Sequence, residues 1–374
     1  MTLCAVRATG RVASDETARA SRTPRTPIYP CGEPPAFGEA RELGSDLCWI
    51  RLELPFSPGH INIWALRDGA GWAVIDSGFA DATTRAAWAH LLGPQGPFGQ
   101  HERHPRLLTR LIATHMHQDH IGMANWLASE YGVALWMTQG EHAASLDAAR
   151  EAQGALPEAH RALYRRAGWS ERALAQHAAR YPRAEAAALH ALPADYTRIA
   201  AGDTLHIGAH AWRVVIGAGH SPEHACLYCP ERKLLLSGDQ VLPRISSNVS
   251  VWPHACDADP LGDWLGSLAH LAHAVPDDVL VLPAHNEPFH GLHARLADLR
   301  TKRERALARL LALLDEPKRA VDVFGALFAR PVDGDVSLLR MATGESLAYL
   351  NHLQHRGEIE SSTDAHGVAW YRRV

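Results

Sequence analysis

Short apolar runs separated by polar turns alternate with helical spacing along the middle of this chain. Runs of this length and composition predict strands, and apolar positions three or four apart predict helices. The predicted strands are residues 47–54, 62–67, 72–75, 111–113, 133–137, 203–207, 212–216, 225–228, 234–236 and 279–282. Helices are predicted at 81–92, 119–129 and 260–274. This order predicts an α+β fold in which helices cover a sandwich of two sheets.

Two stretches depart from this alternation and divide the chain into parts. Between about 141 and 192, Ala, Glu, Arg, His and Leu dominate and strand signals vanish, which predicts a helical insertion. From residue 300 onward, helices are predicted at 303–314, 320–328 and 344–355, followed by a hairpin over 357–371. Three helices and a hairpin resemble a winged-helix domain. The expected parts are therefore a catalytic domain over 46–299 and a winged-helix-like domain over 300–374.

Residues 1–45 carry arginines among Ser, Thr, Ala and Pro, without the apolar core of a secretory signal. A transit peptide and a disordered start both fit this composition, and we favour a disordered segment. No apolar run approaches the roughly 18 residues that a membrane span needs. We therefore expect a cytoplasmic protein that has no membrane partner.

The composition narrows the class of function only slightly. The 374 residues are 47% hydrophobic and carry a net charge of −4, so neither nucleic acid nor an anionic membrane is indicated as an obligate partner. The six cysteines are scattered, with one C-x-x-C pair at Cys226 and Cys229. A zinc site would need a second pair. A redox role is the alternative to two small residues on a strand, which we favour.

The segment from Thr114 to His120, Thr-His-Met-His-Gln-Asp-His, carries the strongest chemical signal. Four potential metal ligands, His115, His117, Asp119 and His120, follow directly after an apolar strand. Neutral imidazoles suit zinc, and a carboxylate adds charge. Although the chain has 24 histidines, a chance cluster does not produce this whole pattern at the end of a strand.

The segment resembles the signature of the metallo-β-lactamase superfamily, and four further motifs occur along the chain in the order expected for that superfamily. Asp76 ends an apolar strand, His220 lies in Gly-His-Ser-Pro-Glu-His, Asp239 in Ser-Gly-Asp, and His285 in Pro-Ala-His. The resemblance covers about residues 46–290. It implies an αββα sandwich and a hydrolase of the glyoxalase-II-like type, or of the β-lactamase-like group that has a C-terminal winged helix.

The resemblance also implies a binuclear metal site, most simply with two zinc ions, although iron or manganese could occupy the second position. The first ion would be held by three ligands and the second by three more, with a carboxylate bridging both. The implied ligands are His115, His117 and His220 for the first ion, Asp119, His120 and His285 for the second, and Asp239 between them. Asp76 and His224 would orient ligands.

The resemblance further implies that a hydroxide held between the two metals is the nucleophile, with Asp119 and Asp239 as the catalytic carboxylates. A bridging aspartate is typical of glyoxalase-II-like hydrolases and phosphodiesterases, so β-lactamase activity is not expected. A small thioester, ester or lactone is the expected substrate. Arg244, Ser246 and Asn248 follow Asp239 closely and are candidate pocket residues.

The alternative is a phosphodiesterase or ribonuclease-like protein whose winged-helix tail binds nucleic acid. Residues 301–374 contain eleven Lys or Arg against ten Asp or Glu, and phosphate binding favours a larger excess of cations. We therefore expect a small-molecule substrate, no nucleic-acid partner, and a tail that caps the active site or forms a homodimer contact.

Overall fold

The computed structural model describes residues 27–99, 107–152, 154–180, 192–193, 195–332 and 334–374. A seven-stranded sheet has the order β1-β2-β3-β4-β5-β6-β7, and a five-stranded sheet has the order β12-β11-β10-β9-β8. The larger sheet contains β1 (Ala40–Gly44), β2 (Leu47–Glu53), β3 (His60–Asp68), β4 (Gly71–Ile75), β5 (Leu108–Ile112), β6 (Ala134–Thr138) and β7 (Tyr196–Ile199). The smaller contains β8 (Thr204–Ile207), β9 (His210–Gly217), β10 (His224–Cys229), β11 (Leu234–Gly238) and β12 (Leu280–Pro283).

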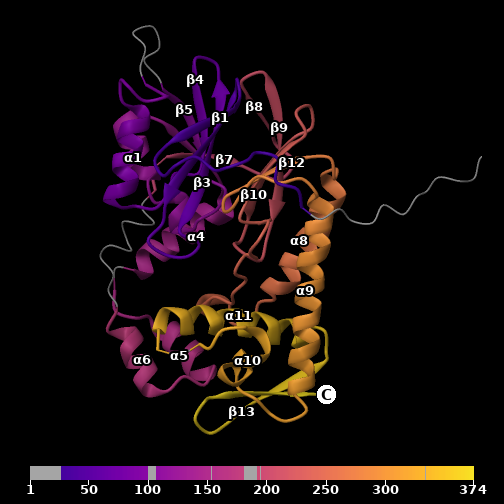
Figure 1. Ribbon diagram of the computed structural model, residues 1–374. Coiled ribbons are helices and arrows are strands. Elements are labelled where there is room, and N and C mark those ends of the chain that lie inside the picture. The colour runs from indigo at the N-terminus through magenta and orange to yellow at the C-terminus, as the bar shows by residue number, and fades with distance from the viewer. Residues whose placement is uncertain (1–26, 100–106, 153, 181–191, 194, 333) are drawn as a thin grey trace, which may run out of the picture.

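The two sheets face each other and helices cover their outer faces (Figure 1). Along β2, Leu47 and Trp49 belong to the apolar cluster between the sheets, whereas Cys48 and Ile50 belong to the outer cluster that includes Trp88. This alternation follows from the two-residue period of a strand. Trp88 lies on α1 (Ala82–Leu92), which covers the larger sheet together with α3 (Ala124–Tyr131), and α8 (Pro260–Ala274) covers the smaller. The predicted αββα sandwich is confirmed.

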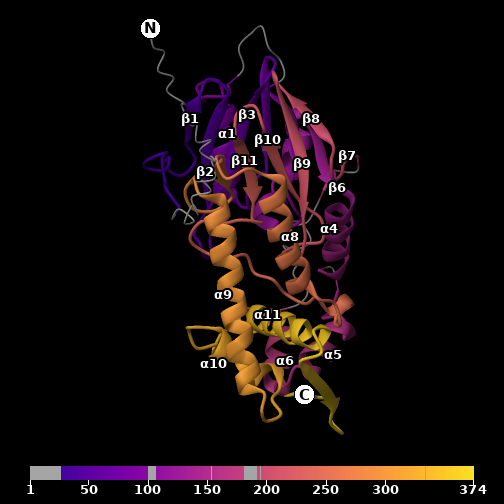
Figure 2. The same cartoon turned by 90° about the vertical axis from the view of Figure 1, so that its right-hand side faces the viewer.

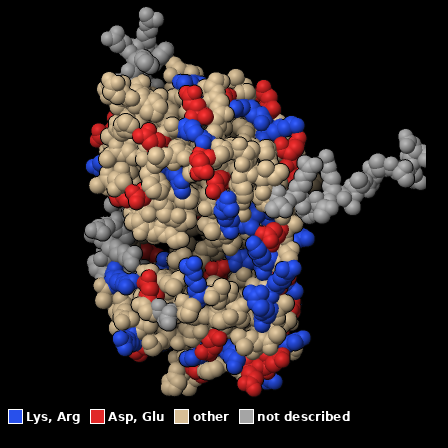
Figure 3. Space-filling model, viewed as in Figure 1, with Lys and Arg blue, Asp and Glu red and all other residues tan. Residues whose placement is uncertain are grey.

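A second lobe, built from helices, lies beneath the sandwich (Figure 2). It combines the predicted insertion with the C-terminal region. Its elements are α5 (Glu158–Arg166), α6 (Glu171–Ala178), the end of α9 (Leu292–Leu313), η2 (Ala320–Val323), α10 (Phe324–Leu327), α11 (Val336–His355), β13 (Ile359–Thr363) and β14 (Ala369–Arg373). Tyr164 and Trp169 of the insertion share a core with Leu347 and Tyr371 of the tail. The space-filling view shows the surface hollowed between the two lobes (Figure 3).

The element boundaries differ from the sequence predictions at several places. β1 lies inside the segment 1–45 that we expected to be disordered, because it pairs antiparallel with β2. The expected boundary at 300 falls inside α9, one continuous helix. The insertion begins with α4 (Gln139–Glu151), and its predicted part 181–191 lies outside the described residues, as do residues 1–26. The helix predicted at 119–129 is broken at Gly122 into α2 (Gln118–Ile121) and α3.

Gly122, at the end of α2, lies where two segments of the chain approach closely. A Cβ atom at this position would lie 2.5 Å from the backbone nitrogen of Ala80, so the chain approaches its neighbour more closely than any larger residue allows. No helix in the described part of the chain is long and apolar enough to cross a membrane.

Asp68, at the end of β3, ties the larger sheet to the turn between β8 and β9. Its carboxylate accepts hydrogen bonds from Thr109 Oγ1 (2.7 Å), Arg110 Nε (3.0 Å) and the Gly208 amide (2.9 Å). Burial raises its pKa, but these donors outweigh that effect and hold the pKa below the usual 3.8.

Asp68→Ala is therefore expected to lower the free energy of unfolding by about 1–3 kcal/mol at neutral pH. Because the pKa is depressed in the folded state, this stabilisation is present above the unfolded-state pKa and is lost as pH falls through the folded value. Urea unfolding of wild type and variant between pH 7 and 3 measures the difference, which should shrink below about pH 4. A difference that stays constant down to pH 3 contradicts this account.

Candidate metal centre

The seven expected ligands come from strand ends and loops of both sheets, and they meet at one edge of the sandwich. The loop after β5 supplies His115 and His117, and the start of α2 supplies Asp119 and His120. The other sheet contributes His220 before β10, Asp239 after β11 and His285 after β12. Residues that are far apart in sequence therefore converge because strand ends of the two sheets lie together.

The first group of side chains contains His115, His117 and His220. Nε2 of His115 lies 2.9 Å from Nδ1 of His117 and 3.2 Å from Nε2 of His220. One nitrogen from each residue falls within 4.8 Å of the others, close enough for all three to bind one ion. The structure thus brings together the first predicted ligand set.

The second group contains Asp119, His120 and His285, and one ligand atom from each residue also lies within 4.8 Å of the others. Oδ2 of Asp119 lies 3.7 Å from Nε2 of His120 and 3.5 Å from Nε2 of His285. Asp239 lies between the groups, with its carboxylate 3.4 Å from Nε2 of His220, 3.7 Å from that of His120 and 3.3 Å from that of His285.

The donor atoms in this centre fit a cation. His120 Nε2 and Asp239 Oδ1 are buried and have no hydrogen-bond partner among the described residues. Orphaned buried polar atoms are costly, and a bound cation would satisfy both. Imidazole nitrogens and carboxylate oxygens are the ligand types that zinc and related divalent metals bind.

The electrostatics of the site separate the histidines into two kinds. Burial and the neighbouring imidazoles lower the pKa of His115 and of His117 well below 6.5, so both are neutral donors. Burial opposes charge on His285 as well, but Asp239 and Asp119 raise its pKa to about 10. Burial also raises the pKa of Asp119, yet His120 and His285 bring it down to about 2. The second group therefore combines one carboxylate with two imidazoles, His120 and His285, whose raised pKa values keep them protonated without metal, and a bound cation would replace those protons.

Each of three ligand histidines is held by its other ring nitrogen. Nδ1 of His120 lies 2.8 Å from a carboxylate oxygen of Asp76, Nδ1 of His220 donates to the Asn248 carbonyl (2.7 Å), and Nδ1 of His285 donates to the His60 carbonyl (2.7 Å). Such bonds fix the tautomer and direct Nε2 of each ring into the centre, where a cation would bind.

Asp76 and His224, which we expected to orient ligands, contact the predicted ligands in different ways: Asp76 through the His120 ring and His224 through the Asp239 backbone. Asp76 has a φ of 67° and also accepts from the Thr114 amide (2.7 Å), so it braces the strand end beside His115. His224 does not contact the side chain of a ligand histidine through a hydrogen bond among the described residues. Instead its Nε2 accepts from the Asp239 amide (3.0 Å). Burial lowers its pKa to about 3, which keeps that nitrogen free to accept.

Glu141 has a role that the sequence analysis missed. It is fully buried, and its carboxylate accepts from the amides of Met116 (2.8 Å) and Glu223 (2.7 Å). It therefore joins the loop carrying His115 and His117 to the loop carrying His220. A glutamate near the start of a helix gives no sequence signal for this long-range role.

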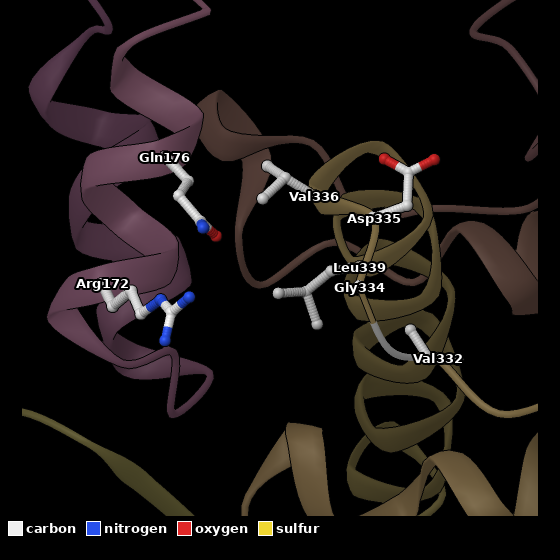
Figure 4. A pocket seen from close by; sticks show the side chains of 7 residues that line it. All are labelled: Arg172, Gln176, Val332, Gly334, Asp335, Val336 and Leu339. Carbon is white, nitrogen blue, oxygen red and sulfur yellow. The ribbon is translucent and has the colours of Figure 1, made fainter.

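The three candidate pocket residues make different contacts, and of the three Asn248 alone contacts a predicted metal ligand. The Arg244 guanidinium bonds to Glu287 (2.8 Å) and is half-exposed. Ser246 lies 3.5 Å from the Arg303 guanidinium, and Asn248 reaches His220 through its backbone carbonyl. Their contact with substrate stays a prediction. A separate cavity of about 300 Å³ lies between α6 and the start of α11, and no predicted ligand lines it (Figure 4).

Comparison with known proteins gives consistent results. The sequence profile of the Metallo-beta-lactamase superfamily matches residues 56–285, and that of the metallo-beta-lactamase-like C-terminal domain matches residues 307–374. The chain is similar to the acyl-coenzyme A thioesterase MBLAC2 of Gallus gallus, with 27% identity over 256 residues, which cover 67% of this chain and 80% of that protein.

Two solved structures resemble most of the chain. A beta-lactamase domain protein from Burkholderia ambifaria is 35% identical and superposes with a TM-score of 0.81, over 92% of this chain and 98% of that one. A metallo-beta-lactamase family protein from Thermus thermophilus is 24% identical, with a TM-score of 0.72 over 89% and 100%, and shares the fold. With five ordered motifs and an αββα sandwich, this chain belongs to the metallo-β-lactamase superfamily.

Proposed function

We propose that this superfamily hydrolase cleaves thioesters, with a small acyl thioester as its substrate. One observation carries the proposal: the Asp239 carboxylate lies between two groups of metal-ligand side chains and within 3.7 Å of histidines from both. That arrangement suits a binuclear site. The similarity to a protein named as an acyl-coenzyme A thioesterase supports the choice of thioesters over other acyl compounds.

Two divalent cations, which we propose to be zinc, would be held by the two groups with Asp239 between them. Iron or manganese is an alternative at the second group. Bound there, they would supply a water of lowered pKa and positive charge for the substrate carbonyl oxygen. The chain's own residues hold this centre in shape, because the partners of His120, His220 and His285 fix three imidazole rings.

The residues near the centre divide the remaining work. Asp119 is more accessible than the buried ligands, so its carboxylate can orient the attacking water. Trp252 lies 6.4 Å from His117, ring centre to ring centre, and offers an apolar face to the acyl group. Water adds to the carbonyl carbon, the carbon–sulfur bond breaks, and a carboxylic acid and a thiol leave.

We expect the purified protein to release free thiol from acyl-coenzyme A or acyl-glutathione, and a chelator to abolish the reaction. Thiol release is followed spectroscopically over a panel of acyl lengths, with a matched oxygen ester and a chromogenic β-lactam as controls. Turnover of the β-lactam without thioester cleavage would overturn the proposal. Absence of thiol release from a metal-loaded sample would do so equally and would make lactones and phosphodiesters the next substrates to test.

The alternative, a phosphodiesterase that binds nucleic acid, has one supporting feature. Four cationic residues lie exposed on α9, namely Arg300, Lys302, Arg305 and Arg309. Against it, α11 uses its polar side chains within the protein: Glu345 pairs with Arg303, and Asn351 donates to the Cys256 and Ala258 carbonyls. Steeply salt-dependent RNA binding would favour this alternative.

A further inference from the structure

The segment Ser246–Ser247–Asn248 lies between the metal centre and the C-terminal region. It follows Asp239 by a few residues, and it contacts both the centre above it and two helices of the lower lobe, α9 and α11. We call residues 246–248 the linking segment. It therefore connects the C-terminal region with residues of the site.

On the side of the centre, the linking segment holds two predicted metal ligands. The Asn248 carbonyl accepts from Nδ1 of His220 (2.7 Å), and the Ser247 hydroxyl donates to the backbone carbonyl of Asp239. Both bonds are buried or nearly so. A shift of the segment therefore displaces the imidazole of one ligand and the backbone of the other.

On the side of the C-terminal region, Arg303 of α9 forms hydrogen bonds to the same segment. Its side chain is only 7% exposed, and its guanidinium donates to the Ser247 carbonyl (2.9 Å) and the Tyr349 hydroxyl (2.7 Å). It forms an ion pair with Glu345 of α11 and lies over the Trp264 ring at 5.2 Å. A planar guanidinium with several fixed donors can hold a loop in one orientation, as a lysine cannot.

Glu345 of α11 contacts both Arg303 and the linking segment. One carboxylate oxygen pairs with Arg303, and the other accepts from the Asn248 side-chain amide (3.2 Å). One residue earlier, the Gly344 carbonyl accepts from the Val251 amide (3.0 Å), and a Cβ atom at Gly344 would lie 2.9 Å from Ser250. The helix thus lies directly against the chain that follows the linking segment.

A buried ion pair of this kind needs a reason, because replacing such a pair by apolar residues of similar volume often leaves stability unchanged or raises it. Orientation of a functional loop is one reason, since charge-assisted hydrogen bonds are directional. The contacts on both sides of the linking segment give this pair such a loop to orient.

We propose that Arg303 and Glu345 are positioning residues, and that the C-terminal domain sets metal affinity by holding His220 and Asp239 through the linking segment. This inference rests on the metal centre of the proposed function, and it does not depend on which substrate the centre hydrolyses. The domain would thereby serve as part of the active-site scaffold.

The test measures zinc binding by the full-length protein in competition with a chromophoric chelator, together with the absorption spectrum of the cobalt-substituted protein. Arg303→Met and Glu345→Gln are each expected to raise the zinc dissociation constant about tenfold, as loss of a group supporting metal ligands does. Both should also shift the cobalt bands, because the geometry of His220 changes. Arg303→Lys, which keeps the charge but not the fork, should lie between wild type and Arg303→Met.

Asn351→Ala is the matched control on the same helix, since it breaks hydrogen bonds to the Cys256 and Ala258 carbonyls without touching the linking segment. It is expected to lower the melting temperature while leaving zinc affinity and the cobalt spectrum unchanged. If Arg303→Met and Glu345→Gln only lower the melting temperature, or if the wild type binds no divalent cation, the inference is wrong. A protein that binds zinc tightly but cleaves no thioester overturns the proposed function alone.

Discussion

Asp239→Ala is expected to reduce both metal content and turnover by about 100-fold or more. Loss of a group that merely supports a metal ligand typically costs about 10–100-fold, and Asp239 is a predicted ligand in contact with histidines of both groups. Its removal also takes away the charge that raises the pKa of His285 to about 10, so this histidine loses its strongest electrostatic partner. Metal analysis after gel filtration and the thioester assay measure the two effects.

Asp239→Asn separates charge from shape, because the amide keeps one oxygen at nearly the same place. We expect this variant to retain more metal than the alanine variant and to show a similarly low turnover. Asp147→Ala is the control, since Asp147 is exposed on α4 and pairs only with Arg150 among the described residues. Full turnover by Asp239→Ala would sink the proposed mechanism.

The parts of the site that could be predicted are those whose residues lie close together in sequence at the ends of predicted strands. His115, His117, Asp119 and His120 fall within six residues after a strand, and each later motif ends or begins a strand. Strand ends are readable from apolar runs, so the edge of the sandwich on which ligands gather follows from the sequence. The αββα fold was predictable for the same reason, together with the resemblance to a known family.

The rest depends on contacts between distant residues, which no local pattern records. Asn248 was singled out as a pocket side chain, whereas its backbone carbonyl holds His220. Glu141 and Arg303 resemble ordinary helix residues in sequence, yet both are buried against loops of the site. Whether a charged side chain can be buried depends on the partners that compensate its charge, and these partners come from other elements.

The division into parts was only partly readable for a related reason. The predicted boundary at 300 followed a change in composition, but α9 runs through it without a break. The insertion and the tail were treated as separate segments, although Trp169 donates to Thr343 (2.8 Å) and both segments bury side chains in one core. Composition along the chain reports local structure, and it does not report which segments share a core.

Glu141→Leu is expected to lower the free energy of unfolding of the metal-free protein by about 2–6 kcal/mol. The substitution leaves the amides of Met116 and Glu223 without their acceptors, and each unsatisfied buried donor costs about 1–3 kcal/mol. Glu141→Gln should cost about half as much, because its single oxygen can serve one of the two amides. Since these amides hold the loops of His115 and His220 together, zinc affinity should fall in the same order, which urea unfolding and chelator competition measure side by side.

Glu130→Gln is the matched control for Glu141→Gln, because it makes the same chemical change at an exposed glutamate on α3. It is expected to leave stability and zinc affinity within error of the wild type. Comparable effects of the two substitutions would mean that Glu141 acts only through the net charge of the protein. A loss confined to Glu141→Gln and Glu141→Leu would instead locate the effect in the two amides, since these are the groups that the buried carboxylate accepts from and the exposed one does not.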